Sequence, residues 1–153
     1  MIIGILGCLG DVWAQYDHHN IWRVVYVYDG DTFLAKQGNK KVKFRLIGIN
    51  TPEKAHKFND YTEEPYNQEA TDYLKSLIHY KPVRVYYDVQ TTDGSDRDLV
   101  YVFSTDKKTF INAELLKAGL AELMTIPPNV AQVDTFTVLY RQAITEGRGM
   151  WTH

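Results

Sequence analysis

The chain has 153 residues, the size of one ordinary domain, and this length can bury enough surface to fold without a disulfide or a structural metal. Apolar residues make up 44% and charged residues 24%, with a net charge of −2, which excludes a disordered chain, a membrane channel and a wholly basic DNA binder. The single cysteine, Cys8, excludes a disulfide framework or a cysteine-rich zinc site within one chain.

Residues 1–20 differ in composition from the rest of the chain. Residues 1–10 are apolar and glycine-rich, and residues 12–14 resemble a signal cleavage site that ends at Ala14. The apolar run is too short to span a membrane and lacks a basic flank. We predict a signal peptide or leader, and hence a secreted or cell-envelope protein. A lipid anchor at Cys8, a plain strand or a mis-assigned start are the alternatives, and a retained segment would mean a cytoplasmic protein.

The next stretch predicts three strands in a meander, over residues 21–28, 32–36 and 40–49. The first is β-branched and aromatic, and the pairs Asp29-Gly30 and Gly38-Asn39 are typical hairpin turns. Alternation in the third strand puts two sets of side chains on opposite faces: Val42, Phe44 and Leu46 on one, Lys43, Arg45 and Ile47 on the other. A turn at Asn50 and Pro52 ends it.

The second half of the domain mixes helices and strands. After a polar loop over residues 54–65, helical spacing of apolar residues predicts a helix over 67–79. Strands are predicted over 83–89 and 99–103, separated by a polar loop over 90–97.

Two further helices are predicted near the C-terminus. Asn112 is expected to cap a helix over 113–118 that ends at Gly119, and a last helix over 133–144 closes at Gly147. Five strands with helices between them predict an α+β fold, a small closed β-barrel with helices on one side, formed by residues 21–153.

Charge is unevenly distributed along this domain. Residues 36–57 hold seven basic residues and one acid, Glu53, whereas residues 58–72 hold five acids and no basic residue. The near-neutral total therefore hides a basic stretch beside an acidic loop. A basic stretch suits a polyanion, but it also suits a solvated strand face on which lysines protect a sheet edge.

Four residues could carry chemistry. Asp31 stands at the start of a strand, where a carboxylate can hold a hard cation. Arg45 interrupts an apolar run, so it needs an anionic partner such as Glu53, or else it lies on an exposed barrel face. Glu53 follows a turn stiffened by proline, and Arg97 lies between two aspartates in a solvated loop. His18 and His19 form a polar leader rather than a zinc site, because no further ligands stand at suitable spacing.

Together, these residues and their neighbours make the chain resemble the staphylococcal nuclease (thermonuclease-like) family. The resemblance covers residues 23–151, and its motifs are YDGDT at 28–32, FRLIGINTPE at 44–53, QEA at 68–70, RDLVYV at 97–102, INAELLKAGLA at 111–121 and GRGMW at 147–151. It implies a five-stranded barrel of the oligonucleotide-binding (OB) type with three helices, in agreement with the strand pattern.

The resemblance also implies an activity: Ca²⁺-dependent hydrolysis of phosphodiester bonds in DNA and RNA, leaving 3′-phosphate and 5′-hydroxyl ends. Asp31, Asn50 and the Thr51 carbonyl then match the metal ligands, and calcium accepts such mixed oxygen ligands. Glu53 matches the carboxylate that activates water, and Arg45 and Arg97 match the arginines that grip the phosphate. DNA and RNA are the expected partners of a monomer without a stable protein partner or a membrane span.

The sequence departs from the family pattern in three places. Asn50 stands where the type member has a carboxylate, which puts calcium affinity in question. Thr125 and Pro127 stand where tyrosines pack near the nucleotide, and the loop 91–96 carries Asp93 and Asp96 instead of basic and tyrosyl phosphate contacts.

Three hypotheses follow from the sequence. The first is an exported metal-dependent nuclease. The second is a non-catalytic nucleic-acid-binding or protein-binding module, like the degenerate nuclease-like domains of Tudor-containing proteins. The presence of Asp31, Arg45, Glu53 and Arg97 favours the first over the second. The third, an intracellular nuclease of plasmid or phage context, depends on whether residues 1–14 are removed.

Overall fold

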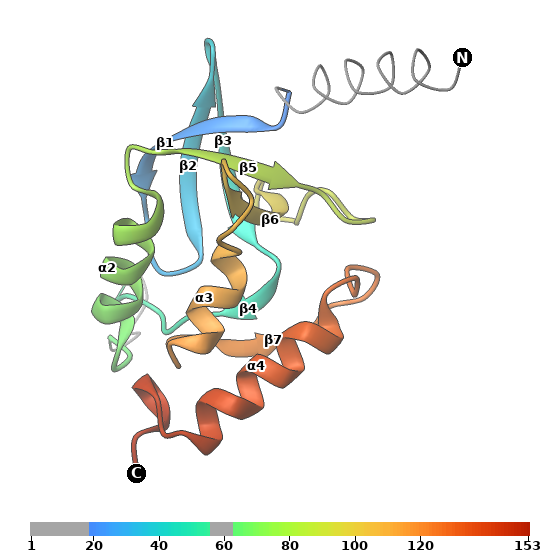
Figure 1. Ribbon diagram of the computed structural model, residues 1–153. Helices are drawn as coiled ribbons and strands as arrows, with labels where there is room; N and C mark the ends of the chain where they lie inside the picture. The colour runs from blue at the N-terminus through green and yellow to red at the C-terminus, as the bar shows by residue number, and fades with distance from the viewer. Residues whose placement is uncertain (1–18, 56–62) are drawn as a thin grey trace.

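A computed structural model describes residues 19–55 and 63–153, and its centre is a closed five-stranded barrel (Figure 1). The strand order is β1-β2-β3-β6-β5, and the β3–β6 pair is parallel while the other pairs are antiparallel. The bounds are β1 Ile21–Val27, β2 Thr32–Gln37, β3 Lys40–Leu46, β5 Pro82–Tyr86 and β6 Asp98–Ser104. The predicted barrel and the β1–β2–β3 meander are therefore confirmed.

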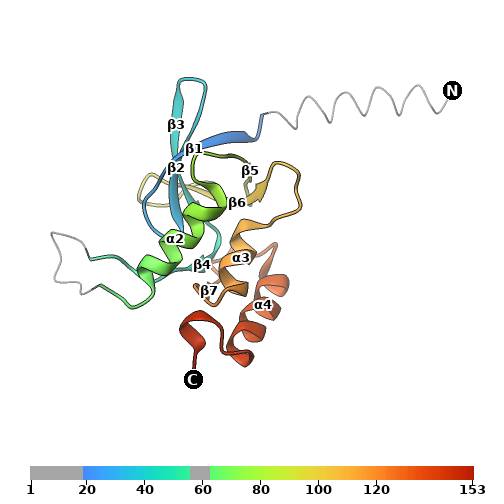
Figure 2. The same cartoon turned by 60° about the vertical axis from the view of Figure 1, so that its left-hand side comes forward.

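In the described part of the chain, three α-helices and a small second sheet lie against one end of the barrel (Figures 1 and 2). Their bounds are α2 Asn67–Ile78, α3 Ile111–Lys117 and α4 Val133–Thr145, followed by a 3₁₀ turn, Gly149–Trp151. The second sheet pairs β4, Gly48–Asn50, with β7, Glu122–Met124. Helix α3 packs against α2, α4 and strand β6, which agrees with the predicted helices on one side.

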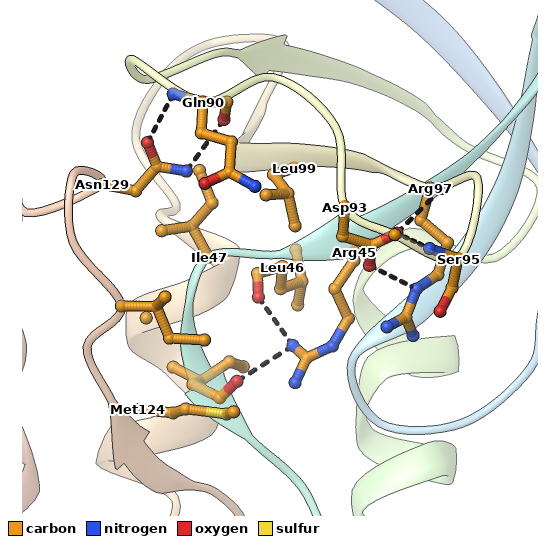
Figure 3. A pocket seen from close by; sticks show the side chains of 14 residues that line it. Arg45, Leu46, Ile47, Gln90, Asp93, Ser95, Arg97, Leu99, Met124 and Asn129 are labelled. Carbon is orange, nitrogen blue, oxygen red and sulfur yellow. Dashed lines mark hydrogen bonds and ion pairs between the residues drawn. The ribbon is translucent and has the colours of Figure 1, made fainter.

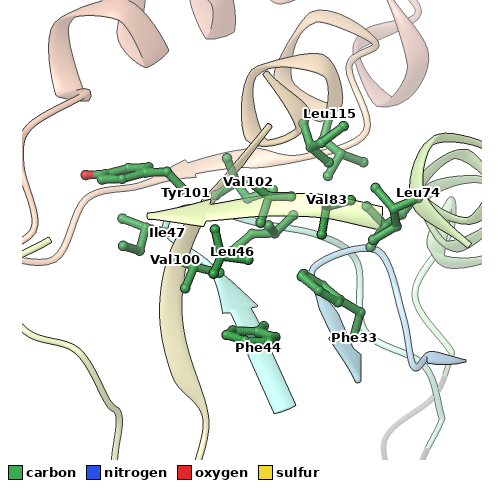
Figure 4. Close-up of a cluster of buried hydrophobic side chains, with 14 of the residues drawn as sticks. Phe33, Phe44, Leu46, Ile47, Leu74, Val83, Val100, Tyr101, Val102 and Leu115 are labelled. Atoms are coloured by element: carbon green, nitrogen blue, oxygen red, sulfur yellow. The ribbon is translucent and has the colours of Figure 1, made fainter. Parts of the chain in front are cut away.

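The hydrophobic core fills the barrel and continues under the helices (Figure 4). Phe33 and Phe44 stack inside the barrel with ring centroids 5.4 Å apart, and Leu74 of α2 and Leu115 of α3 close it from the helical side. All four side chains are fully buried. The core thus fixes strands β2 and β3, from which the candidate site is built.

The predicted third strand is wrong in one respect, because it is two strands. The chain breaks at Ile47, between β3 and β4, and Gly48, the first residue of β4, has a φ of +84°. A Cβ atom at Gly48 would lie 2.5 Å from the Phe136 ring of α4. Only glycine fits that conformation and that space. The break also turns Ile47 into the core, 6% exposed, although strict alternation predicted the opposite face.

The predicted cap of the second C-terminal helix is also wrong. Helix α3 begins at Ile111, so Asn112 lies inside it and is fully buried. Its side chain accepts a hydrogen bond from the Val102 N–H at 2.9 Å and donates to the carbonyls of Ile47 and Val100 at 2.9 and 3.2 Å. Asn112 therefore ties α3 to β6 and to the β3–β4 break.

Sequence patterns also misplaced some ends of elements. Strand β5 ends at Tyr86 rather than at residue 89, and the three-residue strand β7 was not predicted. Residues 1–18 of the proposed leader, with Cys8 and His18, lie outside the described residues, as do residues 56–62 of the predicted polar loop. The last six residues of the predicted acidic loop, 67–72, belong to helix α2. Within the described ranges, no helix combines the length and the apolar character that a membrane span requires.

Candidate active site

The tight turn between β1 and β2 places Asp31 at the mouth of the barrel. Gly30 is buried in this turn, and a Cβ atom there would lie 2.8 Å from the side chains of both Thr51 and Ala70. The turn therefore packs directly on the chain after β4 and on helix α2. The Asp29 carboxylate accepts a hydrogen bond of 2.9 Å from the Asp31 N–H, which holds the turn in shape.

Asp31 is buried, 4% exposed, and both of its carboxylate oxygens are hydrogen-bonded. The Thr32 hydroxyl donates to Oδ1 at 3.0 Å, and the Thr51 N–H and hydroxyl donate to Oδ2 at 3.0 and 3.1 Å. The Arg45 guanidinium forms an ion pair with the same Oδ2 at 3.2 Å. These contacts fix the carboxylate in one orientation.

Arg45 links Asp31 to the β3–β4 break, and Figure 3 shows its guanidinium on the backbone carbonyls of the break. One terminal nitrogen donates to the carbonyls of Leu46 and Ile49 at 2.7 and 2.9 Å. The other contacts Asp31 at 3.2 Å and donates to the Asn50 side-chain oxygen at 3.3 Å. The anionic partner of Arg45 is therefore Asp31, and the expected pair with Glu53 is wrong.

Arg97 reaches the same place from the loop before β6 (Figure 3). Its Nε forms an ion pair with Asp93 at 2.8 Å, and Nη1 donates to the Thr32 hydroxyl at 3.4 Å. Since Thr32 is also a donor to Asp31, the two arginines approach one cluster from two sides. Arg97 lies in a partly exposed loop, as its sequence neighbours indicated, and its guanidinium also reaches Thr32.

Glu53 lies at the exposed rim of the site, just after the buried Pro52. Its backbone is held at both ends by Glu64: the Glu53 N–H donates to the Glu64 carboxylate at 2.7 Å, and the Glu64 N–H donates to the Glu53 carbonyl at 3.1 Å. The negative charge of Glu53 also helps to raise the pKa of Asp29. Glu53 is therefore close enough to act electrostatically on the carboxylates of the turn.

Asp29 is a site residue that the sequence reasoning assigned only to a turn. Burial raises its pKa to about 7, and the neighbouring negative charge of Asp31 contributes to the rise. The available signal was the Asp-Gly-Asp spacing, which can put two carboxylates on one tight turn. At neutral pH Asp29 is therefore about half protonated, because a second negative charge in the turn beside Asp31 is unfavourable without a cation.

The donor set of this cluster fits a hard divalent cation. No group of three or more His, Cys, Asp or Glu side chains is placed to hold a metal among the described residues. The cluster instead offers oxygen donors of mixed type, the carboxylates of Asp29 and Asp31 and the Asn50 amide oxygen, of which the last two now contact Arg45. Calcium accepts such mixtures, and a divalent cation relieves the repulsion between adjacent carboxylates.

A pocket of about 300 Å³ opens between the two arginines and the β4–β7 sheet (Figure 3). Its far wall is apolar, with Met124 and Ile126 exposed by 41% and 55%. Gln90 and Asn129 close the upper end through two hydrogen bonds of 2.8 Å between the backbone of Gln90 and the Asn129 amide. Residues 124–127 thus contribute a thioether and an aliphatic side chain, Met124 and Ile126, to the pocket and no aromatic ring.

All six residues predicted for the site thus lie around one cluster at the mouth of the barrel. Comparisons with known proteins show the family to which the chain belongs. A family model described as "Staphylococcal nuclease homologue" matches residues 43–153. The chain is 31% identical over 132 residues to a thermonuclease of Staphylococcus hyicus, an alignment that covers 86% of this chain and 76% of that protein. A thermonuclease of Staphylococcus intermedius is 33% identical over 122 residues, covering 80% and 68%. An uncharacterized endonuclease of Escherichia coli O157:H7 is 32% identical over 133 residues, covering 85% and 76%.

Proposed function

The chain belongs to the staphylococcal nuclease family and is a hydrolase of the nuclease class, and from this premise we propose a specific reaction. The protein hydrolyses phosphodiester bonds in DNA and RNA with Ca²⁺ as cofactor, and leaves 3′-phosphate and 5′-hydroxyl ends. One observation carries the proposal: the ion pair and hydrogen bonds that join Asp31, Arg45, Asn50 and Thr51, with Arg97 at their edge.

The two arginines are suited to hold the scissile phosphate. The Nη1 atom of Arg45 stays on the Leu46 and Ile49 carbonyls, which fixes the plane of the guanidinium. Its other edge, now on Asp31 and Asn50, can turn to phosphate oxygens. Arg97 is less buried, and within the described residues Asp93 and Thr32 contact its Nε and Nη1, so that Nη2 is the nitrogen placed to meet the substrate. Two planar forks around one phosphate stabilise the charge that grows on its oxygens in the transition state.

Glu53 is the residue suited to take the proton of the attacking water. It is exposed at the rim, next to the buried carboxylates, and its backbone is fixed by Glu64. A carboxylate positioned rigidly but open to solvent can accept a proton as the oxygen–phosphorus bond forms, and can release it to solvent afterwards.

Asp31, Asn50 and the Thr51 carbonyl would hold the calcium ion, with Asp29 adding a second negative charge nearby. When bound, Ca²⁺ supplies Lewis-acid stabilisation of the phosphate and orients it for in-line attack. The hydrogen bonds from Thr32 and Thr51 keep the Asp31 carboxylate in its orientation, so little reorganisation is needed when the substrate binds.

The test compares the wild type with Glu53→Gln on single-stranded DNA and RNA, with Ca²⁺ or with chelator. We expect cleavage by the wild type only with Ca²⁺, and a loss of two or more orders of magnitude in turnover for Glu53→Gln. Analysis of the products should find 3′-phosphate ends. Binding without cleavage in any metal would refute the proposal in favour of a non-catalytic nucleic-acid-binding module.

We further propose that residues 21–153 form the catalytic domain and that the protein acts outside the cytoplasm after loss of its leader. The apolar start of the sequence and the small residue at Ala14 support this proposal. N-terminal sequencing of the mature protein tests it, with Gln15 expected as the first residue. A mature protein that keeps residues 1–14 would refute it.

A further inference from the structure

The outer face of strands β1, β2 and β3 carries a cluster that the reaction does not use. We call it the tyrosine–lysine face, and its members are Arg23, Tyr26, Tyr28, Lys36, Lys41 and Lys43. Tyr26 and Tyr28 contact each other edge to face, with centroids 4.9 Å apart, and the Lys43 ammonium lies 4.7 Å from the centroid of the Tyr28 ring. Tyr26, near the end of β1, is 53% exposed, and Tyr28, just after β1, is partly exposed.

A local irregularity in β1 turns Tyr26 outward. The register between β1 and β2 shifts between Val24 and Tyr26, so that Val25 is an extra residue, while Val24 and Val27 both stay buried. Such bulges re-aim side chains. The exposed tyrosine therefore results from a specific backbone feature and not from simple alternation.

The face continues directly from the candidate active site. Along β3, the side chains of Lys41, Lys43 and Arg45 project to the same side, because the residues between them point the other way and Phe44 is in the core. Across the strands, Thr32 pairs with Arg45 at the site, and Leu34 pairs with Lys43 two residues further along. The row of basic side chains on β3 thus runs from Arg45 at the site to Lys41, four residues along the strand, a distance of about 13 Å.

The charge of the face is of one sign. Between residues 19 and 45 the acids are Asp29 and Asp31, and both belong to the site, whereas the outward positions of the three strands hold Arg23, Lys36, Lys41 and Lys43. Lysines by themselves are explained by the need for a solvated strand face, but an exposed tyrosine among them is not. Exposed tyrosines beside lysines are the pair of features that single strands of nucleic acid require, since bases stack on the rings and phosphates meet the cations.

The geometry points to a second binding site on the tyrosine–lysine face, which holds the part of a single-stranded substrate that extends beyond the scissile bond. Tyr26 stacks on a base, and Lys41 and Lys43 contact backbone phosphates. This inference rests on the proposed nuclease function for its biological sense, but the binding itself can be measured without catalysis.

The experiment uses fluorescence anisotropy in the Glu53→Gln background with chelator, so that no strand is cleaved. The probes are a labelled dT 12-mer and an abasic 12-mer with the same phosphates. Tyr26→Leu should weaken binding of the dT 12-mer about ten-fold and leave the abasic strand unaffected, and Tyr26→Phe should retain affinity. The double variant Lys41→Ala/Lys43→Ala should weaken both probes and lower the salt slope by about 2.

Matched controls come from elsewhere on the surface. Tyr80→Leu removes a tyrosine ring that is 69% exposed and keeps the backbone carbonyl that accepts from Arg23 of the face, and Lys108→Ala removes an exposed lysine of the β6–α3 turn. Both controls should bind like the parent. In the active protein, Tyr26→Leu should raise KM for the 12-mer about ten-fold at unchanged kcat, and should leave cleavage of a dinucleotide unchanged.

The outcomes separate this inference from the proposed function. Equal affinity of Tyr26→Leu and its parent for the dT 12-mer would overturn the inference, whether or not the protein cleaves. The inference would also be overturned if Tyr26→Leu weakened binding of the abasic strand as much as binding of the dT 12-mer. It would likewise be overturned if Lys41→Ala/Lys43→Ala changed the affinity for neither strand. Binding that depends on Tyr26 in a protein that cleaves nothing would sustain the inference and refute the proposed function.

Discussion

Replacing each of the two arginines by lysine should separate their structural and chemical roles. The side chain of Arg45 is 11% exposed and makes two hydrogen bonds to carbonyls, one to Asn50 and an ion pair with Asp31. The side chain of Arg97 is 30% exposed, and its main partner is Asp93. Both variants should lose activity, but only Arg45→Lys should also lose substantial stability.

The expected magnitudes follow from the partners that each lysine would leave behind. A lysine ammonium is a single point with three donors, so at position 45 it cannot serve both carbonyls and both side-chain oxygens. A buried carbonyl without a donor costs about 1–3 kcal/mol, and partial recovery by lysine leaves an expected loss of about 2 kcal/mol. At position 97 the lost pair is partly exposed, and the cost should stay below about 1 kcal/mol. Loss of a fixed transition-state donor should lower kcat about 10²-fold or more in both variants.

Two measurements test this reasoning. Urea unfolding gives the free energy of unfolding, with an unchanged m-value as the sign that both variants still fold to the same state. Turnover on single-stranded DNA at saturating Ca²⁺ gives the chemical effect. If Arg45→Lys unfolds at the same urea midpoint as the parent, the guanidinium does not hold the β3–β4 break. If both variants keep near wild-type turnover, the arginines do not act on the phosphate.

Three further predictions concern the metal and the core. Excess chelator should abolish hydrolysis and added Ca²⁺ should restore it, because the donors around Asp31 are hard oxygens; full activity in chelator would contradict this. Asn50→Asp should tighten calcium binding about ten-fold in an activity titration, since a new charge on the ion outweighs repulsion from Asp31; an unchanged or weaker constant would mean that residue 50 does not face the metal. Asn112→Ala should lower the free energy of unfolding by about 2–4 kcal/mol in urea, because it leaves the Val102 N–H and the Ile47 carbonyl buried without partners; a loss below about 1 kcal/mol would show that water replaces them.

The sequence predicted the barrel well because its signals are local. Alternating strands, glycine turns and helical spacing each depend on neighbours within a few residues. The candidate residues also come together as expected, since the turn at Asp31 and the end of β3 meet at the mouth of one barrel. The resemblance to a family supplied the roles that isolated residues could not.

What the sequence did not reveal depends on contacts between distant segments. Nothing near Arg45 indicates that its partner is Asp31 rather than Glu53, because the pairing follows from the β2–β3 register. The burial of Asn112 depends on carbonyls from β6 and from the β3–β4 break. The sequence around Asp29 indicated only a turn, and the raised pKa of its carboxyl follows from its burial beside Asp31 in the folded chain.

The β3–β4 break explains how a helix remote from the chemistry shapes the site. In a regular strand the carbonyls of residues three apart point in opposite directions, so Leu46 and Ile49 could not both meet one guanidinium nitrogen. The turn at Gly48 brings both carbonyls onto Arg45, and this turn needs a residue without a side chain because Phe136 of α4 packs against it. Helix α4 thereby fixes Arg45 and, through it, the orientation of the Asp31 carboxylate. The position of the Asp31 carboxylate thus depends on core packing as much as on the strand that carries it.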